Sequence, residues 1–209
     1  KTQTVAKSST VTTNRNFYEA AIWVRIGDWG TTYTISIDGT TNFTHSVPAT
    51  STYTSGNNPD ETETTTKKIT AELVKALNNG SAPTYSSGET NFTVHGKSHI
   101  TAYHREEESV IYFKTANRTT DFTIESKDSK DFGHMRVFKD RTAKFANLPT
   151  KGPSAMGGFE IKVAGDFTKD QDDFYVRAVY NNTTKEITYA ECAKDNITHQ
   201  LDASTLPRR

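Results

Sequence analysis

The sequence predicts an α+β fold that is mostly β, with antiparallel sheets and hairpins and one main helix at about residues 61–77. Apolar side chains recur at every second position in many short segments, which is the period of a strand with one buried face. Thr, Ser, Asn and Tyr are frequent, and they favour strands joined by polar turns. The 209 residues can bury a core without disulfides, and the single Cys192 is expected to be a packed structural thiol.

The charges of the chain balance. Its 25 basic and 25 acidic side chains give no net charge, whereas nucleic-acid binders usually carry a strong basic excess. No apolar run approaches the roughly 20 residues of a membrane-spanning helix. The sequence therefore favours neither a DNA-binding protein nor a membrane protein.

The first predicted strands lie between residues 17 and 47. Apolar side chains alternate over residues 17–26, and the glycines of residues 27–30 suit a chain reversal before the alternation resumes at residues 33–37. A second turn, Asp38-Gly39, leads into residues 43–47. The pattern predicts a three-stranded meander that begins with a hairpin.

Two tryptophans in this region have no assigned place in the meander. Trp23 lies on the opposite face of its strand from the apolar residues, and Trp29 lies in the turn. They form either an exposed contact surface or packing against another element.

The predicted helix has sequence signals at both ends. Asp60 or Thr62 is a suitable N-cap, and the acidic residues that follow suit the positive end of the helix dipole. Asn78-Asn79-Gly80 is a typical stop. The apolar stripe, which is expected to lie across a sheet, consists of Ile69, Leu73 and Leu77.

Further short strands are predicted after the helix, and a charged turn at residues 105–108 is expected to close a hairpin between two of them. Their ranges are 92–95, 98–104, 110–114, 121–126 and 134–138. Gly and Pro are concentrated between residues 145 and 158, which is the composition of a linker. We therefore expect residues 1–145 to form a mixed β domain with one helix, and residues 146–209 to form a β-rich segment of the same or a second subdomain.

The C-terminal segment shows the clearest alternation. Residues 159–163 and 174–180 read as half-buried strands, and the polar residues 181–186 are typical of a hairpin turn before the next strand starts at Ile187. Val176 and Tyr189 are therefore expected on neighbouring strands.

No metal or cofactor site is predicted. The one histidine cluster, His95, His99 and His104, is spaced too widely along a strand to share an ion unless a turn folds it together. Acidic residues gather just before the strand at 174–180, where they form either a calcium loop or a solvated turn; they are Asp166, Asp170, Asp172 and Asp173. The spacing and central glycine of an EF-hand are absent.

No catalytic residue is predicted either, because the common nucleophile and phosphate-loop motifs do not occur. A glycoside hydrolase would need two carboxylates about 5–9.5 Å apart. Glu160, Asp173 and Glu191 are the candidates for such a pair on one sheet.

Three blocks of the chain carry a resemblance to a known family. Residues 21–39 contain a strand, a Gly-rich turn and a Tyr-centred strand, and residues 145–149 contain Phe, a spacer and Leu-Pro. The C-terminal block has an Asp-aromatic-Tyr-Val step, an aromatic-x-Glu step and a Thr-x-Pro step, carried by Asp173, Tyr175, Val176, Tyr189, Glu191, Leu206 and Pro207. These blocks resemble the tail tubular protein B family, the nozzle proteins of short-tailed bacteriophages. Tyr189 replaces the tryptophan of the family and Leu206 its methionine, and both exchanges keep apolar bulk.

The resemblance implies a structural component of the phage tail, located in the virion, that forms part of the conduit for DNA ejection and has no enzymatic activity. Its partners would be other copies of the parent protein in a ring, expected to be a hexamer, the tail adaptor protein and, in passing, phage DNA. In the family this region is internal to a longer polypeptide, so the chain is expected to be an internal fragment. The alternative is a carbohydrate-binding or polysaccharide-degrading tail module, which exposed aromatic residues and scattered carboxylates would support.

Overall fold

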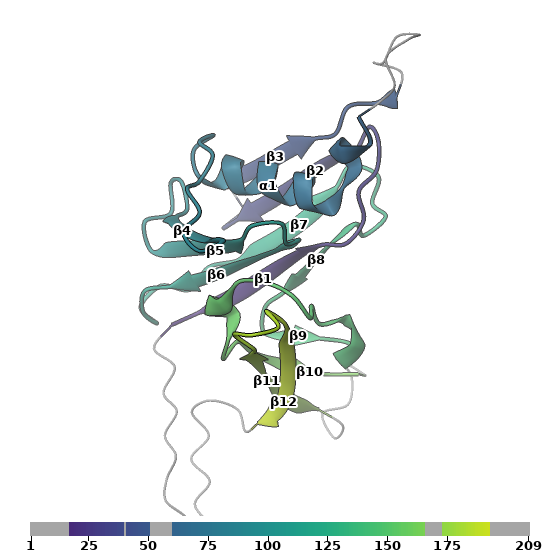
Figure 1. Ribbon diagram of the computed structural model, residues 1–209. Coiled ribbons are helices and arrows are strands. Elements are labelled where there is room, and N and C mark those ends of the chain that lie inside the picture. The colour runs from purple at the N-terminus through teal and green to yellow at the C-terminus, as the bar shows by residue number, and fades with distance from the viewer. Residues whose placement is uncertain (1–16, 40, 51–59, 166–172, 193–209) are drawn as a thin grey trace, which may run out of the picture.

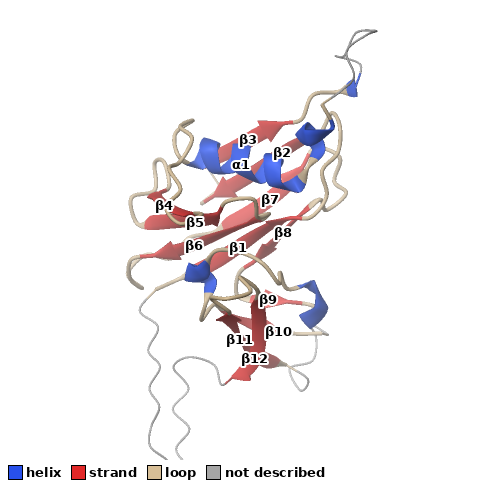
Figure 2. Cartoon of the chain, in the orientation of Figure 1, coloured by secondary structure: helices blue, strands red, loops and turns tan. Residues whose placement is uncertain are grey.

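A computed structural model describes residues 17–39, 41–50, 60–165 and 173–192, and it confirms an α+β fold that is mostly β. The described strands form three sheets, of five, four and three strands. Figure 1 shows the five-stranded sheet in the middle of the molecule, with the three-stranded sheet and the α-helix on one side and the four-stranded sheet on the other. Figure 2 shows that loops and short helical turns connect these layers.

The five-stranded sheet is antiparallel throughout and has the order β4-β5-β6-β1-β8. The predicted hairpin around residues 105–108 is confirmed, because β5 and β6 pair directly. Strand β6 is buried on both faces, which explains its nearly continuous apolar run Val-Ile-Tyr-Phe. The strands are β1 (Glu19–Val24), β4 (Glu89–Thr93), β5 (Ile100–Arg105), β6 (Val110–Thr115) and β8 (Met135–Phe138).

The three-stranded sheet has the order β3-β2-β7, with strands β2 (Thr32–Ile37), β3 (Thr41–Ser46) and β7 (Ile124–Asp128). The predicted turn at Asp38-Gly39 is confirmed, since β2 and β3 form an antiparallel hairpin across it. Both residues have positive φ, 54° and 65°, which Gly and Asp tolerate better than most residues.

The predicted hairpin between residues 17–26 and 33–37 is wrong. Strand β1 has β6 on one edge and β8 on the other, and its end is held on both sides: the Val24 amide donates to the Ser109 carbonyl at 2.9 Å, and the Arg25 amide donates to the His134 carbonyl at 2.8 Å. Residues 27–30 therefore carry the chain from one sheet to another. Gly27 is needed there, because an added Cβ would lie 1.7 Å from the Thr64 carbonyl oxygen.

The predicted helix is present, but its first turn is not α-helical. A 3-10 turn, η2 (Glu61–Thr64), precedes α1 (Thr66–Leu77). Asp60 caps η2 by accepting from the Thr62 amide, while Thr65 is extended and caps α1 by accepting from the Lys68 amide. The α-helix thus begins later than predicted, because Thr65 is the second cap. The predicted apolar stripe is buried, and no helix in the described part is long and apolar enough to cross a membrane.

The four-stranded sheet has the order β12-β11-β10-β9, in which only β9 and β10 are parallel. Its strands are β9 (Arg141–Thr142), β10 (Glu160–Val163), β11 (Phe174–Tyr180) and β12 (Ile187–Cys192). Between β9 and β10 lie two 3-10 turns, η3 (Phe145–Asn147) and η4 (Ser154–Met156). The sheet thus draws its first strand from before residue 145, and a domain boundary at 145/146 stays a prediction.

Two apolar cores hold the three sheets together. The first core lies between the five-stranded sheet, the three-stranded sheet and α1, and includes Ile22, Tyr33 and Leu73. The second core lies between the opposite face of the five-stranded sheet and the four-stranded sheet, and includes Tyr112 and Phe159. Each face of the central sheet therefore has its own core.

The two tryptophans follow this division. Trp23 is partly buried against the second core and Trp29 against the first. They pack on different cores and do not form one exposed contact surface, which settles the two alternatives in favour of packing.

Candidate functional site

The motif residues that the structure describes lie on β11 and β12 and just before β11. Val176 is opposite Ile161 of β10 and Glu191 of β12, and only 1% of it is exposed. Tyr189 is opposite Ala178, so it lies on the same face of the sheet as Val176. The prediction that Val176 and Tyr189 lie on neighbouring strands is confirmed. The structure says nothing of Leu206 and Pro207, which lie outside the described residues.

Tyr189 connects β12 to the linker-like segment. Its hydroxyl donates to the Pro149 carbonyl at 2.9 Å, and its ring meets the Phe145 ring edge-on with centroids 6.1 Å apart. Burial raises the pKa of Tyr189, so the hydroxyl stays a hydrogen-bond donor. Tyr189 thus places an aromatic ring with a polar donor between β12 and this segment.

The candidate acids do not form a catalytic pair. A carboxylate oxygen of Glu160 lies 3.1 Å from the Arg177 guanidinium, and Asp173 forms an ion pair with Lys162. Only 8% of each of these two carboxylate side chains is exposed. Glu191 is exposed near the end of β12, on the face of Val176. Two of the three predicted acids are thus engaged in internal ion pairs, and the third lies on the other face of the sheet.

The histidines do not form a metal site. His104 is buried, and its Nε2–H donates to the Glu108 carbonyl at 2.9 Å because a carbonyl can only accept. Nδ1 therefore accepts from the Tyr85 hydroxyl, 2.8 Å away. Burial lowers the pKa of His104, which favours this neutral form. No group of three or more His, Cys, Asp or Glu residues that could hold a metal occurs in the described part of the chain, and Asp166, Asp170 and Asp172 lie outside it.

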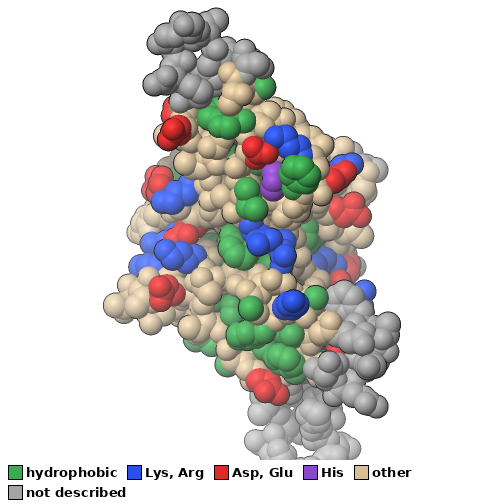
Figure 3. All heavy atoms as spheres, turned by 90° about the vertical axis from the view of Figure 1, so that its right-hand side faces the viewer, with side chains coloured by type: hydrophobic (Ala, Val, Ile, Leu, Met, Phe, Trp, Pro, Cys, Tyr) green, Lys and Arg blue, Asp and Glu red, His purple; other side chains and the backbone are tan. Residues whose placement is uncertain are grey.

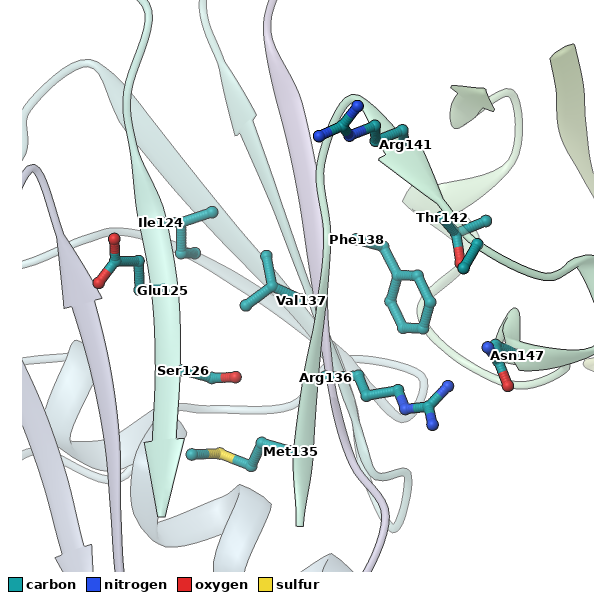
Figure 4. A pocket seen from close by; sticks show the side chains of 11 residues that line it. Ile124, Glu125, Ser126, Met135, Arg136, Val137, Phe138, Arg141, Thr142 and Asn147 are labelled. Carbon is teal, nitrogen blue, oxygen red and sulfur yellow. The ribbon is translucent and has the colours of Figure 1, made fainter. Parts of the chain in front are cut away.

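An open groove of about 680 Å³ lies where the three sheets meet, between the edge strands β7 and β8 and the segment from β9 to η3. Figure 4 shows two sides to it. Ile124 and Ser126 of β7 face Val137 and Met135 of β8 across one side. On the other side of β8 lie Arg136, Phe138, Thr142 and Asn147.

A loop that exposes an aromatic residue stands beside this groove. Asp128 is 3% exposed, and its carboxylate accepts from the backbone amides of Lys130, Phe132 and His134 at 3.1, 3.0 and 3.0 Å. Phe132 is nevertheless 71% exposed. The buried carboxylate thus fixes a loop that presents an apolar ring to solvent.

The sequence predicts a polar turn at residues 127–131, but it does not predict how the loop is fixed, and it does not predict the groove. The Asp-Ser-Lys-Asp-Phe-Gly stretch at residues 128–133 was recognisable as a polar turn, but no sequence signal shows that its first carboxylate is buried. The groove depends on two edge strands from different sheets. Figure 3 shows one face of the molecule, on which hydrophobic and basic side chains lie together near the middle.

Comparison with known proteins places the chain in a family. The family model for the bacteriophage nozzle protein matches residues 1–209, which is the whole chain. No curated protein matches it. The chain therefore belongs to the bacteriophage nozzle protein family and is a structural component of the phage tail in the virion.

Proposed function

We propose that this chain is a wall module of the conduit through which DNA leaves the virion. In this proposal, copies of the parent protein form a ring, expected to be a hexamer, that adjoins the tail adaptor protein. The motif residues Asp173, Tyr175, Val176, Tyr189 and Glu191 help to define the sheet that gives the module its shape. The proposal rests on membership of the nozzle family and on the charge arrangement described next.

The observation that carries the proposal is the internal pairing of cations. Most partly buried lysines and arginines of the described residues have a carboxylate within 4.0 Å. The pairs are Lys68–Glu72, Lys97–Asp38, Arg105–Glu89, Lys130–Asp28, Lys139–Asp121, Lys162–Asp173 and Arg177–Glu160. Each lysine–phosphate contact adds affinity for DNA. A surface with little uncompensated positive charge would therefore let a duplex pass without holding it.

The same pairing argues against the alternative of a polysaccharide-degrading module. Catalysis needs a nucleophile or acid, a base and a group that orients them within hydrogen-bond reach. Glu160 and Asp173 are engaged by cations, and His104 uses both ring nitrogens in structural hydrogen bonds. We infer that the module has no enzymatic activity. Release of reducing sugar from host polysaccharide that disappears in Glu191→Gln would contradict this.

Duplex DNA binding tests the charge argument. The wild-type chain should give no salt-sensitive shift of duplex DNA at micromolar concentration. The double variant Asp28→Asn with Asp38→Asn removes the carboxylate partners of Lys130 and Lys97, while Lys130 keeps its hydrogen bond to the Trp29 carbonyl. It should bind weakly, with an affinity that falls as salt rises. The matched control is Glu125→Gln with Glu186→Gln, which changes the net charge equally at exposed positions. Equal binding by the two double variants would mean that net charge, and not the freed lysines, decides DNA affinity.

A further inference from the structure

Two arginines at the open end of the second core lie close together. Arg136 of β8 pairs with Trp23 of β1, and residues directly opposite each other share a face of the sheet. The guanidinium of Arg25 lies 5.6 Å from the centre of the Trp23 ring. Because Trp23 packs against the second core, both arginines lie on the face of β1 and β8 that is turned toward the four-stranded sheet.

These arginines differ from most of the other partly buried cations. Among the described residues, no carboxylate lies within 4.0 Å of the Arg25 or Arg136 guanidinium, although both arginines are partly buried. The pKa of Arg136 is lowered by burial and, to a smaller extent, by the charge of Arg25. Two like charges with partial burial and no counter-ion disfavour each other, and an anion placed between them would relieve this repulsion.

The groove supplies room and further polar groups beside Arg136. Figure 4 shows Arg136 extending from β8 to the side where Asn147 of η3 lies, with the Phe138 ring next to it. Arg141 lines the same groove but points away from Asn147. A guanidinium and an amide can each donate to an oxyanion, and the guanidinium matches the two oxygens of a carboxylate.

Two exposed apolar residues lie near the same end of β1 and β8 as Arg25. Ile26, next to Arg25, is 47% exposed, and its amide is 3.3 Å from the His134 carbonyl. The 71%-exposed Phe132 ring lies 5.7 Å from the His134 ring, between centroids. Exposed aromatic and aliphatic side chains beside arginine are the composition of protein–protein contact surfaces. DNA would instead call for a stripe of several cations.

We propose that Arg25, Arg136 and Asn147 form a site for a single oxyanion, and that a neighbouring protein chain in the phage tail supplies it as an aspartate or glutamate side chain. Ile26, which points to the opposite side of the chain from Arg25, and Phe132 would add an apolar rim near the same end of β1 and β8. The inference rests on the proposed function, because it takes the neighbour to be another chain of the nozzle assembly.

The site itself is tested by NMR titration of the arginine Nε–Hε signals with acetate and inorganic phosphate at constant ionic strength. The Arg25 and Arg136 signals should shift along a saturable curve with both anions and not with chloride. The double variant Arg25→Gln with Arg136→Gln should bind acetate about tenfold more weakly or worse, since two charge-assisted hydrogen bonds are lost. The control Arg118→Gln removes an arginine whose Nε–H donates to the Phe17 carbonyl, and it should leave the curve unchanged. Shifts that stay linear, or that the control abolishes as well, would overturn the site.

The source of the oxyanion is tested in phage. Arg136→Glu should impair tail assembly, and suppressor mutations should exchange an acidic residue of a tail protein for Lys or Arg. If suppressors arose only at codon 136, or if added phosphate alone restored tail assembly, the oxyanion would not be the side chain of a neighbouring protein. Binding of duplex DNA that depends on Arg25 and Arg136 would contradict both this proposal and the proposed passage of DNA along a weakly binding wall. If the wild-type chain bound neither acetate nor phosphate and also did not bind duplex DNA, the oxyanion site would be overturned, but the proposed conduit function would not.

Discussion

Replacing Val176 with aspartate places a carboxylate in the second core. Val176 is 1% exposed and packs in the core that joins the four-stranded sheet to the central sheet. Losing the burial of a valine costs about 2 kcal/mol. At pH 7 the new carboxyl must also take up a proton to avoid a buried charge, which costs about 1.36 × (7 − 3.9), or about 4 kcal/mol. The sum of about 6 kcal/mol is comparable with the total stability of many domains.

The same strand provides a matched control. Val179 of β11 is 51% exposed, so Val179→Asp should cost less than about 0.5 kcal/mol. Urea unfolding followed by tryptophan fluorescence suits this comparison, because Trp23 packs against the second core. The deficit of Val176→Asp should shrink as the pH falls toward 4, because the carboxyl then becomes protonated in a growing fraction of the unfolded chains as well. Equal urea midpoints for the two variants would refute the assigned faces of β11.

Three further substitutions test other parts of the fold. Asp128→Asn should lower the free energy of unfolding in urea by about 1.5–3 kcal/mol, since three backbone amides lose a charged acceptor. The control Asp131→Asn, at an exposed position, should be nearly neutral. Similar losses for the two variants would mean that the Asp128 carboxylate does not hold the loop. Burial lowers the pKa of His104 in the folded chain, so between pH 7.5 and 5 this histidine takes up a proton more readily in the unfolded chain, and the free energy of unfolding should fall as the pH falls. His104→Gln should flatten this pH dependence. An unchanged slope would show that His104 does not cause it. Gly27→Ala should lower the melting temperature by many degrees, because the new Cβ would overlap the Thr64 carbonyl. A melting temperature like that of the wild type would show that the segment of residues 27–30 is not tightly packed against Thr64.

Local patterns predicted the strands and the helix because they report which side chains are buried. The alternation in residues 174–180 and 187–191 gave both strands and their hairpin, since the turn between them is short and polar. The stripe through Leu73 likewise predicted the buried face of α1. The α-helix boundary was missed because Thr65, an unremarked residue of the Thr-rich stretch, is the residue that caps it.

Partners that are distant in sequence could not be predicted in this way. Glycines at both ends of residues 27–30 look like a hairpin turn, yet Gly27 is required by its contact with Thr64, and β1 pairs with strands about 90 and 110 residues away. The proposed oxyanion site depends on the same pairing, because Arg25 and Arg136 meet only when β8 is next to β1. Arg25 lies in the block of residues 21–39, but nothing in that block marks it as a binding residue, and Arg136 lies outside all three blocks.

An image reconstruction of the phage tail during DNA ejection, at a resolution that traces β-sheets, would test the proposed function most directly. The chain should recur around the tail axis in a closed ring next to the adaptor, and DNA density should run through the ring. An acidic side chain of the adjoining chain should meet Arg136. A reconstruction that places the three-sheet fold on peripheral fibres, away from the path of DNA, would contradict the proposed function.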